Sequence, residues 1–245
     1  MDNIKLCFII ACKIYKNYDI YIDFYVNNIN NFYPNSKIIL VDNNSTYMEY
    51  YDRFKDISNI TILENTSNSK FEVGAYKFAT EYIIKNKIIA DYYICTQDTF
   101  VLVNKYDFNI LVNNKVKAAS ISHFDFSRTF NLHIPVLLKL GLYDPNERFL
   151  CCWCCSWVCD IKSLLYINLL LKDICPIVRS ESEQTERYMG KILKMLNNNI
   201  SYAIESGVES NNDYNCHCID PRSDESKKTG HFFIKRAQQK TEKTI

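Results

Sequence analysis

The chain has 245 residues, 47% of them hydrophobic, and a formal net charge of +1 at pH 7. This length and apolar content exclude a disordered chain and allow one α/β domain with a sizeable core. The near-neutral charge, without a dominant basic stretch, argues against nucleic acid as the main partner.

No apolar stretch of the sequence is long enough to span a bilayer. The stretch after Lys162 ends at Lys172, well short of the ~20 residues that a transmembrane helix needs. The first apolar run, Leu6 to Cys12, stops at Lys13 and indicates a strand rather than a signal peptide. Because eleven cysteines occur without an export signal, we expect reduced thiols and a cytoplasmic protein without a transmembrane segment.

The first half of the chain alternates predicted strands and helices. Unbroken apolar runs such as Ile38–Val41 are typical of strands buried on both faces of a parallel sheet. Apolar residues at helical spacing predict helices, and Pro34 ends the first of them. Strands are thus predicted at 5–12, 37–42, 59–63 and 92–95, and helices at 19–33 and 72–84. Ser45 or Thr46 can cap a further short helix that carries Met48, Tyr51 and Phe54. The alternation predicts an α/β fold with a Rossmann-like, mostly parallel central sheet flanked by helices.

The second half is less regular, and no internal repeat or linker separates it from the first. The segment 151–159 is dense in cysteine and tryptophan. A strand is predicted at 116–123, helices at 161–171 and 183–196, a polar loop over 209–230, and a docking segment at 231–234 before a charged tail. We therefore expect a single domain.

Two predicted strands end in an acid. Asp42 follows the second strand and begins a polar turn, and Asp98 follows the fourth strand within Thr96–Thr99. Because ligands of open α/β sheets bind at the carboxyl ends of the strands, the two acids indicate one shared polar site. Asp42 can accept hydrogen bonds from ribose hydroxyls or a base N–H, and Asp98 can hold a divalent cation beside phosphates. Each acid taken alone is explained at least as well by a turn or a helix cap.

A polar loop, Asn65–Lys70, opens a predicted helix that begins Glu72-Val73-Gly74-Ala75. The small residues Gly74 and Ala75 permit the close approach of a ligand or a neighbouring strand, or serve helix packing alone. Together with the two strand ends, and in this order, these motifs resemble those of GT-A-type glycosyltransferases that use nucleotide sugars, of the family-2-like kind. The resemblance covers roughly Lys5–Phe108.

The resemblance implies a nucleotide-sugar-binding half, 1–108, and an acceptor-binding half, 109–245, of one GT-A-like domain that ends in a closing segment and tail. It implies that Asp98 is the last acid of the Asp-x-Asp motif and binds Mn²⁺ or Mg²⁺, which bridges the donor diphosphate. Thr96 stands where the first acid of that motif is expected, so fewer hard oxygens reach the cation. The residues that the resemblance implies in donor binding are Ala11, Cys12, Lys13, Asp42, Asn65, Gly74 and Asp98.

Inverting members of that family need a base that takes the proton of the acceptor hydroxyl. The resemblance implies that the acidic segment Glu183–Arg187 supplies it. Glu186 is the first candidate, because it borders the apolar face of its predicted helix. Glu183 is the rival, although its position after Ser180 also fits a capping box and it can pair with Arg187. Ordinary acids at a helix start explain both equally well.

Some GT-A enzymes take a further metal ligand, often a histidine, from the C-terminal segment. His231, beside an apolar strand-like run, and His217 are the candidates, and a surface histidine without a ligand is the alternative. Lys235 and Arg236 follow closely in the sequence. They can close over the diphosphate as cations or only solvate the tail.

The cysteines of 151–159 form overlapping Cys-x-x-Cys pairs, to which the segment 216–218 can add ligands for zinc. A helical interpretation instead places the cysteines at 151, 155 and 159 on one buried stripe. The two tryptophans of the segment are either core residues or a platform for acceptor sugars. The zinc interpretation and the core interpretation both stay open at this point.

The predicted function is the transfer of a sugar from a UDP- or GDP-type donor to a hydroxyl of a glycan acceptor, with Mn²⁺ or Mg²⁺ as cofactor. Because Thr96 replaces an acid, a catalytically inactive GT-A-like carbohydrate-binding or scaffold protein is the alternative. A zinc-stabilised interaction module and a nucleotidyltransferase are further alternatives. The donor sugar, acceptor, linkage, stereochemistry and oligomeric state do not follow from the fold.

Overall fold

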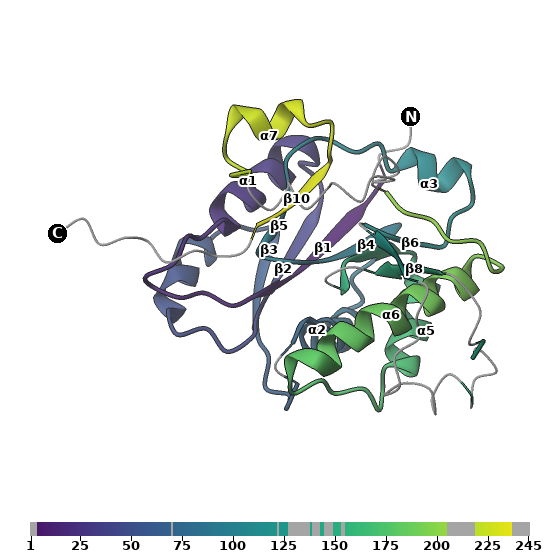
Figure 1. The fold of residues 1–245 in the computed structure, drawn as a ribbon. Coiled ribbons are helices and arrows are strands. Elements are labelled where there is room, and N and C mark those ends of the chain that lie inside the picture. Colours follow the sequence, from purple (N-terminus) through teal and green to yellow (C-terminus); the bar gives the residue numbers. More distant parts are fainter. Residues whose placement is uncertain are drawn as a thin grey trace.

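A six-stranded sheet forms the centre of the protein (Figure 1). The computed structural model describes residues 4–69, 71–121, 123–126, 138, 143–144, 149–152, 155–204 and 219–236. The strand order is β3-β2-β1-β4-β9-β6. Its strands are β1 (Leu6–Cys12), β2 (Lys37–Asp42), β3 (Ile60–Glu64), β4 (Tyr92–Gln97), β6 (Ala118–Ser120) and β9 (Trp157–Cys159).

The strands β1, β2, β3 and β4 run parallel, and the register places Ile9 beside Ile39 on one side and Cys95 on the other. β9 runs antiparallel to β4, and β6 runs antiparallel to β9. All residues of β2 except Lys37 are buried, which explains the unbroken apolar run of this strand. The predicted class, an α/β fold with a mostly parallel sheet flanked by helices, is confirmed.

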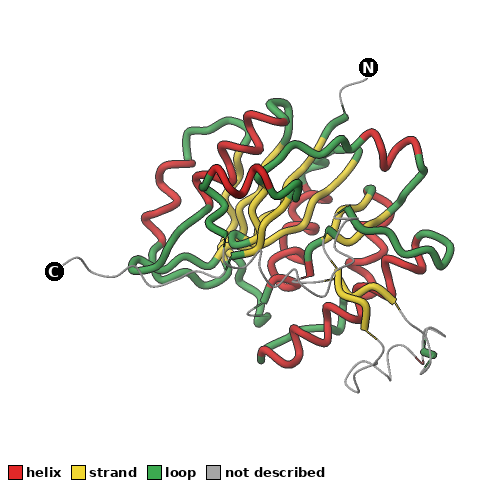
Figure 2. Tube along the Cα trace, turned by 45° about the horizontal axis from the view of Figure 1, so that its top comes forward, coloured by secondary structure: helices red, strands yellow, loops and turns green. Residues whose placement is uncertain are grey.

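Helices cover both faces of the sheet, so that the strands form the middle layer (Figure 2). One face carries α1 (Ile22–Phe32) and the 3-10 helix η1 (Met48–Phe54), and the other carries α2 (Glu72–Lys85), α5 (Ile161–Leu170) and α6 (Arg179–Leu196). Successive residues of β1 point to opposite faces. Phe8 therefore belongs to the same core as Tyr25 of α1, and Ile9 to the same core as Tyr76 of α2.

The order of the strands reverses between β1 and β4. The chain passes from β1 to β2 and β3 on one side, and β4 then lies on the other side of β1. The crossover helices α1 and α2 accordingly pack on opposite faces of the sheet. This arrangement leaves a crevice at the carboxyl ends of β1 and β4, where doubly wound sheets bind their ligands.

Smaller elements border the sheet. β5 (Phe100–Leu102) pairs antiparallel with β10 (Phe233–Lys235), and β7 (His123–Phe126) pairs antiparallel with β8 (Phe149–Cys152). α3 (Asn109–Asn113) and α7 (Asp224–Lys228) are short helices, and α7 and β10 lie on the α1 side of the sheet in Figure 1. Within the described residues, no helix is both long and apolar enough to cross a membrane.

Some elements differ from those predicted. α6 begins at Arg179 instead of 183, because Glu181 Oε2 accepts from the N–H of Ile177 at 2.7 Å and caps the helix start. α7 lies within the segment predicted as a loop, and Ser223 caps it. Cys151 lies on β8 and Cys159 on β9, so the helical stripe is wrong; Cys155, between these strands, has a positive φ of 45°.

Candidate functional site

A cleft of about 540 Å³ lies at the carboxyl ends of β1, β2 and β4, at the switch point of the sheet. Its volume falls in the range of small-molecule sites. Four residues predicted to bind the donor, Ala11 to Lys13 and Asp98, are brought together in it. The lining residues are Ala11, Cys12, Lys13, Tyr15, Asn43, Phe71, Glu72, Gln97, Asp98, Thr99 and Ile177.

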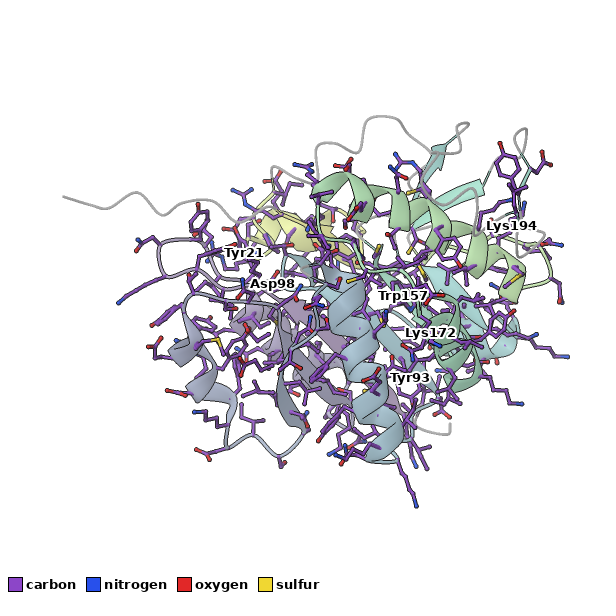
Figure 3. The ribbon with its side chains drawn as sticks, turned by 90° about the horizontal axis from the view of Figure 1, so that it is seen from below. Tyr21, Tyr93, Asp98, Trp157, Lys172 and Lys194 are labelled. Carbon is purple, nitrogen blue, oxygen red and sulfur yellow. The ribbon has the colours of Figure 1, made fainter. Side chains whose placement is uncertain are left out.

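Asp98 is held in the cleft by the two strands that meet there. Its backbone N–H donates to the Ala11 carbonyl at 2.9 Å, and its Oδ2 accepts from the Lys13 N–H at 2.8 Å. Only 8% of the residue is exposed. This burial raises the pKa of Asp98 to about 6, although the Lys13 N–H and the Lys235 charge oppose the rise. Figure 3 shows Asp98 by one end of α2.

Glu72, the first residue of α2, is a second acid in the cleft wall. Its Oε1 accepts from Gln97 Nε2, and its Oε2 accepts from the Ser182 hydroxyl at 3.2 Å. Burial raises the pKa of Glu72, while these hydrogen bonds and the Lys235 charge lower it. Sequence reasoning gave Glu72 no role, because an acid in the first turn of a helix is usually explained by the helix dipole.

Lys235 brings a positive charge to the same strand end from β10. The strand register pairs Lys235 with Phe100, directly after the end of β4 and its turn. Its Nζ donates to Gln97 Oε1 and to Thr99 Oγ1, the residues on either side of Asp98. Two acids and one ammonium from three distant parts of the chain therefore meet at this strand end.

Asp42 does not line the cleft, although it was predicted to contact the nucleotide. It is only 2% exposed, and its carboxylate accepts from the Tyr51 hydroxyl at 2.8 Å and from the N–H groups of Asn44 and Ser45 at 3.2 Å. These contacts are those of a turn cap. The next residue, Asn43, lines the cleft instead.

The loop before α2 contacts a residue that lines the cleft. Asn65 Nδ2 donates to Asn43 Oδ1 at 2.8 Å, so Asn65 orients a lining residue without lining the cleft itself. Gly74 also stays out of the lining. A Cβ at Gly74 would lie 2.4 Å from Ser69 Cβ, so this glycine permits the close approach of the loop to the helix.

The two candidate bases lie in different environments on α6. Glu183 is exposed; its carboxylate forms an ion pair with Arg179 at 2.7 Å, and its backbone carbonyl accepts from Arg187. Its position inside the helix also rules out the predicted capping box. Glu186 is half-buried, with Cys151 Sγ 4.0 Å from its Oε2. Neither carboxylate is among the lining residues of the cleft.

The described residues do not fit a divalent cation held by the protein at Asp98. Thr96 is fully buried and hydrogen-bonded to a tyrosine of α1, on the other face of β4. The β10 segment places His231 beside Asn104, whose Nδ2 donates to the His231 carbonyl at 2.7 Å, at the far end of β5 from Asp98. Across the described part of the chain, no three His, Cys, Asp or Glu residues are grouped to hold a metal ion.

The described cysteines of 151–159 are buried thiols. Burial raises the pKa of Cys155 and of Cys159, which opposes the thiolate form that zinc requires. Trp157 is 1% exposed and packs edge-on against Tyr76, with ring centroids 4.8 Å apart, so it is a core residue. The other residues considered for zinc or for sugar stacking, 153–154 and 216–218, lie outside the described residues, as does the metal candidate His217.

No protein-family model and no curated protein matches the chain. Among solved structures, S. aureus TarS 1–349 is similar over 76% of this chain and 56% of that chain, with 12% identity and a TM-score of 0.43. The mannosyltransferase PcManGT from Pyrobaculum calidifontis, in complex with GDP-Man and Mn²⁺, is similar over 66% of this chain and 46% of that chain, with 11% identity and a TM-score of 0.39. The chain thus spans about half of these structures. Similarity at this level carries no argument for function, which rests on the cleft.

Proposed function

We propose that the chain is a GT-A-type glycosyltransferase whose donor, a nucleoside diphosphate sugar of the UDP or GDP type, binds in the cleft between β1 and β4. One observation carries the proposal: the buried carboxylate of Asp98 lies at the switch point of the sheet, hydrogen-bonded to the Lys13 N–H at 2.8 Å. Ligands of doubly wound sheets bind at such points. A carboxylate there can accept hydrogen bonds from the hydroxyls of a sugar or ribose.

In the proposed reaction, an oxygen of an acceptor hydroxyl attacks C1 of the donor sugar. The bond from this oxygen to C1 forms while the bond from C1 to the diphosphate breaks, and the nucleoside diphosphate leaves with the bonding electrons. The hydroxyl proton passes to a carboxylate base if the configuration at C1 inverts. Binding, orientation and stabilisation of the charge on the leaving diphosphate are the contributions expected from the cleft.

Glu186 is the proposed base. It lies one turn after Ser182 on α6, and Ser182 donates to Glu72 in the cleft wall. After burial, the charges of Glu186 and Glu72 are the next causes that raise the pKa of the Cys155 thiol, so both carboxylates lie within electrostatic range of it. Glu183 has no such neighbour and is paired with Arg179. These contacts favour Glu186 over Glu183.

The proposed division into a donor half, 1–108, and an acceptor half, 109–245, is supported by the lining of the cleft. Every lining residue except Ile177 belongs to the first half. The second half contributes the proposed base on α6 and, from β10, the ammonium of Lys235.

Isothermal titration of the full chain with UDP- and GDP-sugars, with and without Mn²⁺, tests donor binding. Binding of at least one donor supports the proposal, and no binding of any donor under either condition refutes it. Donor binding should weaken in Asp98→Asn, because the amide replaces one of the two carboxylate acceptors with a donor.

The base is tested by comparing Glu186→Gln with Glu183→Gln on the same helix. Glu186→Gln should lower turnover by ~100-fold or more while donor affinity stays close to that of the wild type, because a base acts on the acceptor hydroxyl. Glu183→Gln should leave turnover near the wild-type value. The reverse pattern would assign the role of base to Glu183.

A carbohydrate-binding or scaffold protein without turnover is the second candidate. The position of Thr96 favours it, because this residue is buried on the α1 face and offers no acid to the cleft. This candidate predicts that a donor or glycan binds without release of nucleoside diphosphate. Release above that of an Asp98→Ala, Glu186→Ala double variant would exclude it.

A further inference from the structure

We propose that the ammonium of Lys235 is the cation that binds the donor diphosphate, so that donor binding needs no divalent metal. This inference rests on the proposed function and specifies how the same cleft holds its ligand. It departs from the metal dependence expected from the sequence, in which Asp98 binds Mn²⁺ or Mg²⁺.

The contacts of Lys235 place a fixed positive charge at the end of β4. Its Nζ donates to Gln97 Oε1 and Thr99 Oγ1, both from residues that line the cleft. An ammonium has three N–H donors, and the described residues accept two of them. Both acceptors are neutral oxygens, so the charge is not cancelled by a direct ion pair.

Two acids, Asp98 and Glu72, lie at the same strand end as Lys235. Its Nζ donates to Gln97 and Thr99, on either side of Asp98, so the ammonium lies close to that carboxylate. A divalent cation at Asp98 would be attracted by the carboxylate but repelled by the ammonium beside it. The carboxylate of Glu72 already accepts from Gln97 and Ser182, which leaves it poorly placed as a second ligand.

The other cations near the cleft have different positions. Lys13 lines the cleft, with its Nζ 5.8 Å from the centre of the Tyr15 ring. The side chain of Arg236 contacts Tyr21, with its Nε donating to the Tyr21 hydroxyl at 3.2 Å. Lys235 is not itself a lining residue, but its Nζ donates to two of them, so its charge acts at the β4 end of the cleft, while Lys13 lines the cleft at the β1 end. Lysine ammonium groups bind phosphate as point charges and do not need the fork geometry of arginine.

Titration calorimetry in EDTA tests the proposal, with UDP, GDP and their sugar conjugates as ligands and the full chain as the protein. We expect at least one of these ligands to bind in EDTA, and added Mn²⁺ to change its Kd by less than about twofold. Lys235→Gln should weaken binding of that nucleoside diphosphate by roughly 10- to 100-fold, as expected for a lost charge-assisted contact. It should weaken binding of the bare nucleoside far less, since the nucleoside has no diphosphate.

Two further variants separate charge from structure. Lys235→Arg keeps the charge and should retain most of the affinity that Lys235→Gln loses. Lys227→Gln, on the exposed side of α7, removes one positive charge from the same C-terminal segment and should leave the Kd unchanged. Thermal unfolding of each variant shows whether it is folded, and the EDTA titration of the wild type decides the question even if Lys235→Gln does not fold.

Three results would count against this role of Lys235. They are binding that appears only with Mn²⁺, unchanged diphosphate affinity in folded Lys235→Gln, and an equal loss of nucleoside and diphosphate affinity. Each would overturn the inference and leave the proposed function standing. No binding of any nucleotide sugar, with EDTA or with Mn²⁺, would overturn both.

Discussion

Replacing Asp98 by asparagine should stabilise the folded protein at neutral pH. Burial raises the pKa of Asp98 from 3.8 to about 6, so the folded chain binds this proton more tightly than the unfolded chain does. As the pH rises from about 4 to 6, the unfolded state releases the proton first and folding stability falls. The difference in pKa corresponds to about 3 kcal/mol above pH 6. The asparagine side chain carries no charge, so the Asp98→Asn protein should escape this loss.

The assay is the free energy of unfolding of the wild type and Asp98→Asn, measured by denaturant titration between pH 4 and pH 8. The difference between the two proteins should be small near pH 4 and grow to about 3 kcal/mol above pH 6, or roughly 6–12 °C in Tm. Asp91→Asn is the matched control, because the exposed Asp91 accepts from the Lys5 N–H at 2.7 Å at the other end of the same two strands. A difference that does not change with pH, or a less stable Asp98→Asn at pH 8, would refute the reasoning.

Two further substitutions test how the walls of the cleft are built. Thr96→Asp should not create a metal site but should destabilise the protein by about 3 kcal/mol or more, because it buries a charge beside Tyr25. Thr96→Val should cost only about 1 kcal/mol, and tight Mn²⁺ binding by a stable Thr96→Asp protein would contradict this prediction. Gly74→Ala should cost about 1–3 kcal/mol, because the new Cβ meets Ser69 Cβ at 2.4 Å. Adding Ser69→Gly should recover part of that loss, and strict additivity of the two changes in the free energy of unfolding would contradict the contact.

The sheet could be predicted from sequence because its strands are buried on both faces. The run Ile38–Val41 has no polar interruption, and the predicted strand 37–42 matches β2 residue for residue. The helices after β1 and β3 follow from apolar spacing in the same way. Alternation of these elements was enough to expect a parallel sheet with ligands at its carboxyl ends. The position of the cleft therefore followed from local patterns.

The side chains that line or border the cleft could be predicted less well from the sequence than its position could. The reasons differ from residue to residue. Successive residues of a strand face opposite sides, so Thr96 lies under α1 while Gln97 faces the cleft. The hydrogen bond from Thr96 to Tyr25 of α1 shows that an acid at position 96 would lie on the α1 face and not in the cleft. Lys235, by contrast, is 136 residues from its partner Thr99, and no local pattern could reveal that contact. Asp42 shows a third case, since its polar turn predicts a ligand contact and a cap equally well.

The proposed charged ligand offers a reason for the buried charges at the end of β4. An interior chosen only for stability would hold apolar groups there, since replacing buried ionic groups by apolar ones is often neutral or stabilising. Instead, burial raises the pKa of both Asp98 and Glu72, so each carboxylate opposes folding at neutral pH. Lys235 offsets this only in part, and it is itself half-buried. In the proposed complex the ammonium of Lys235 would pair with the diphosphate, and the stability lost by burying these charged groups would then serve ligand binding.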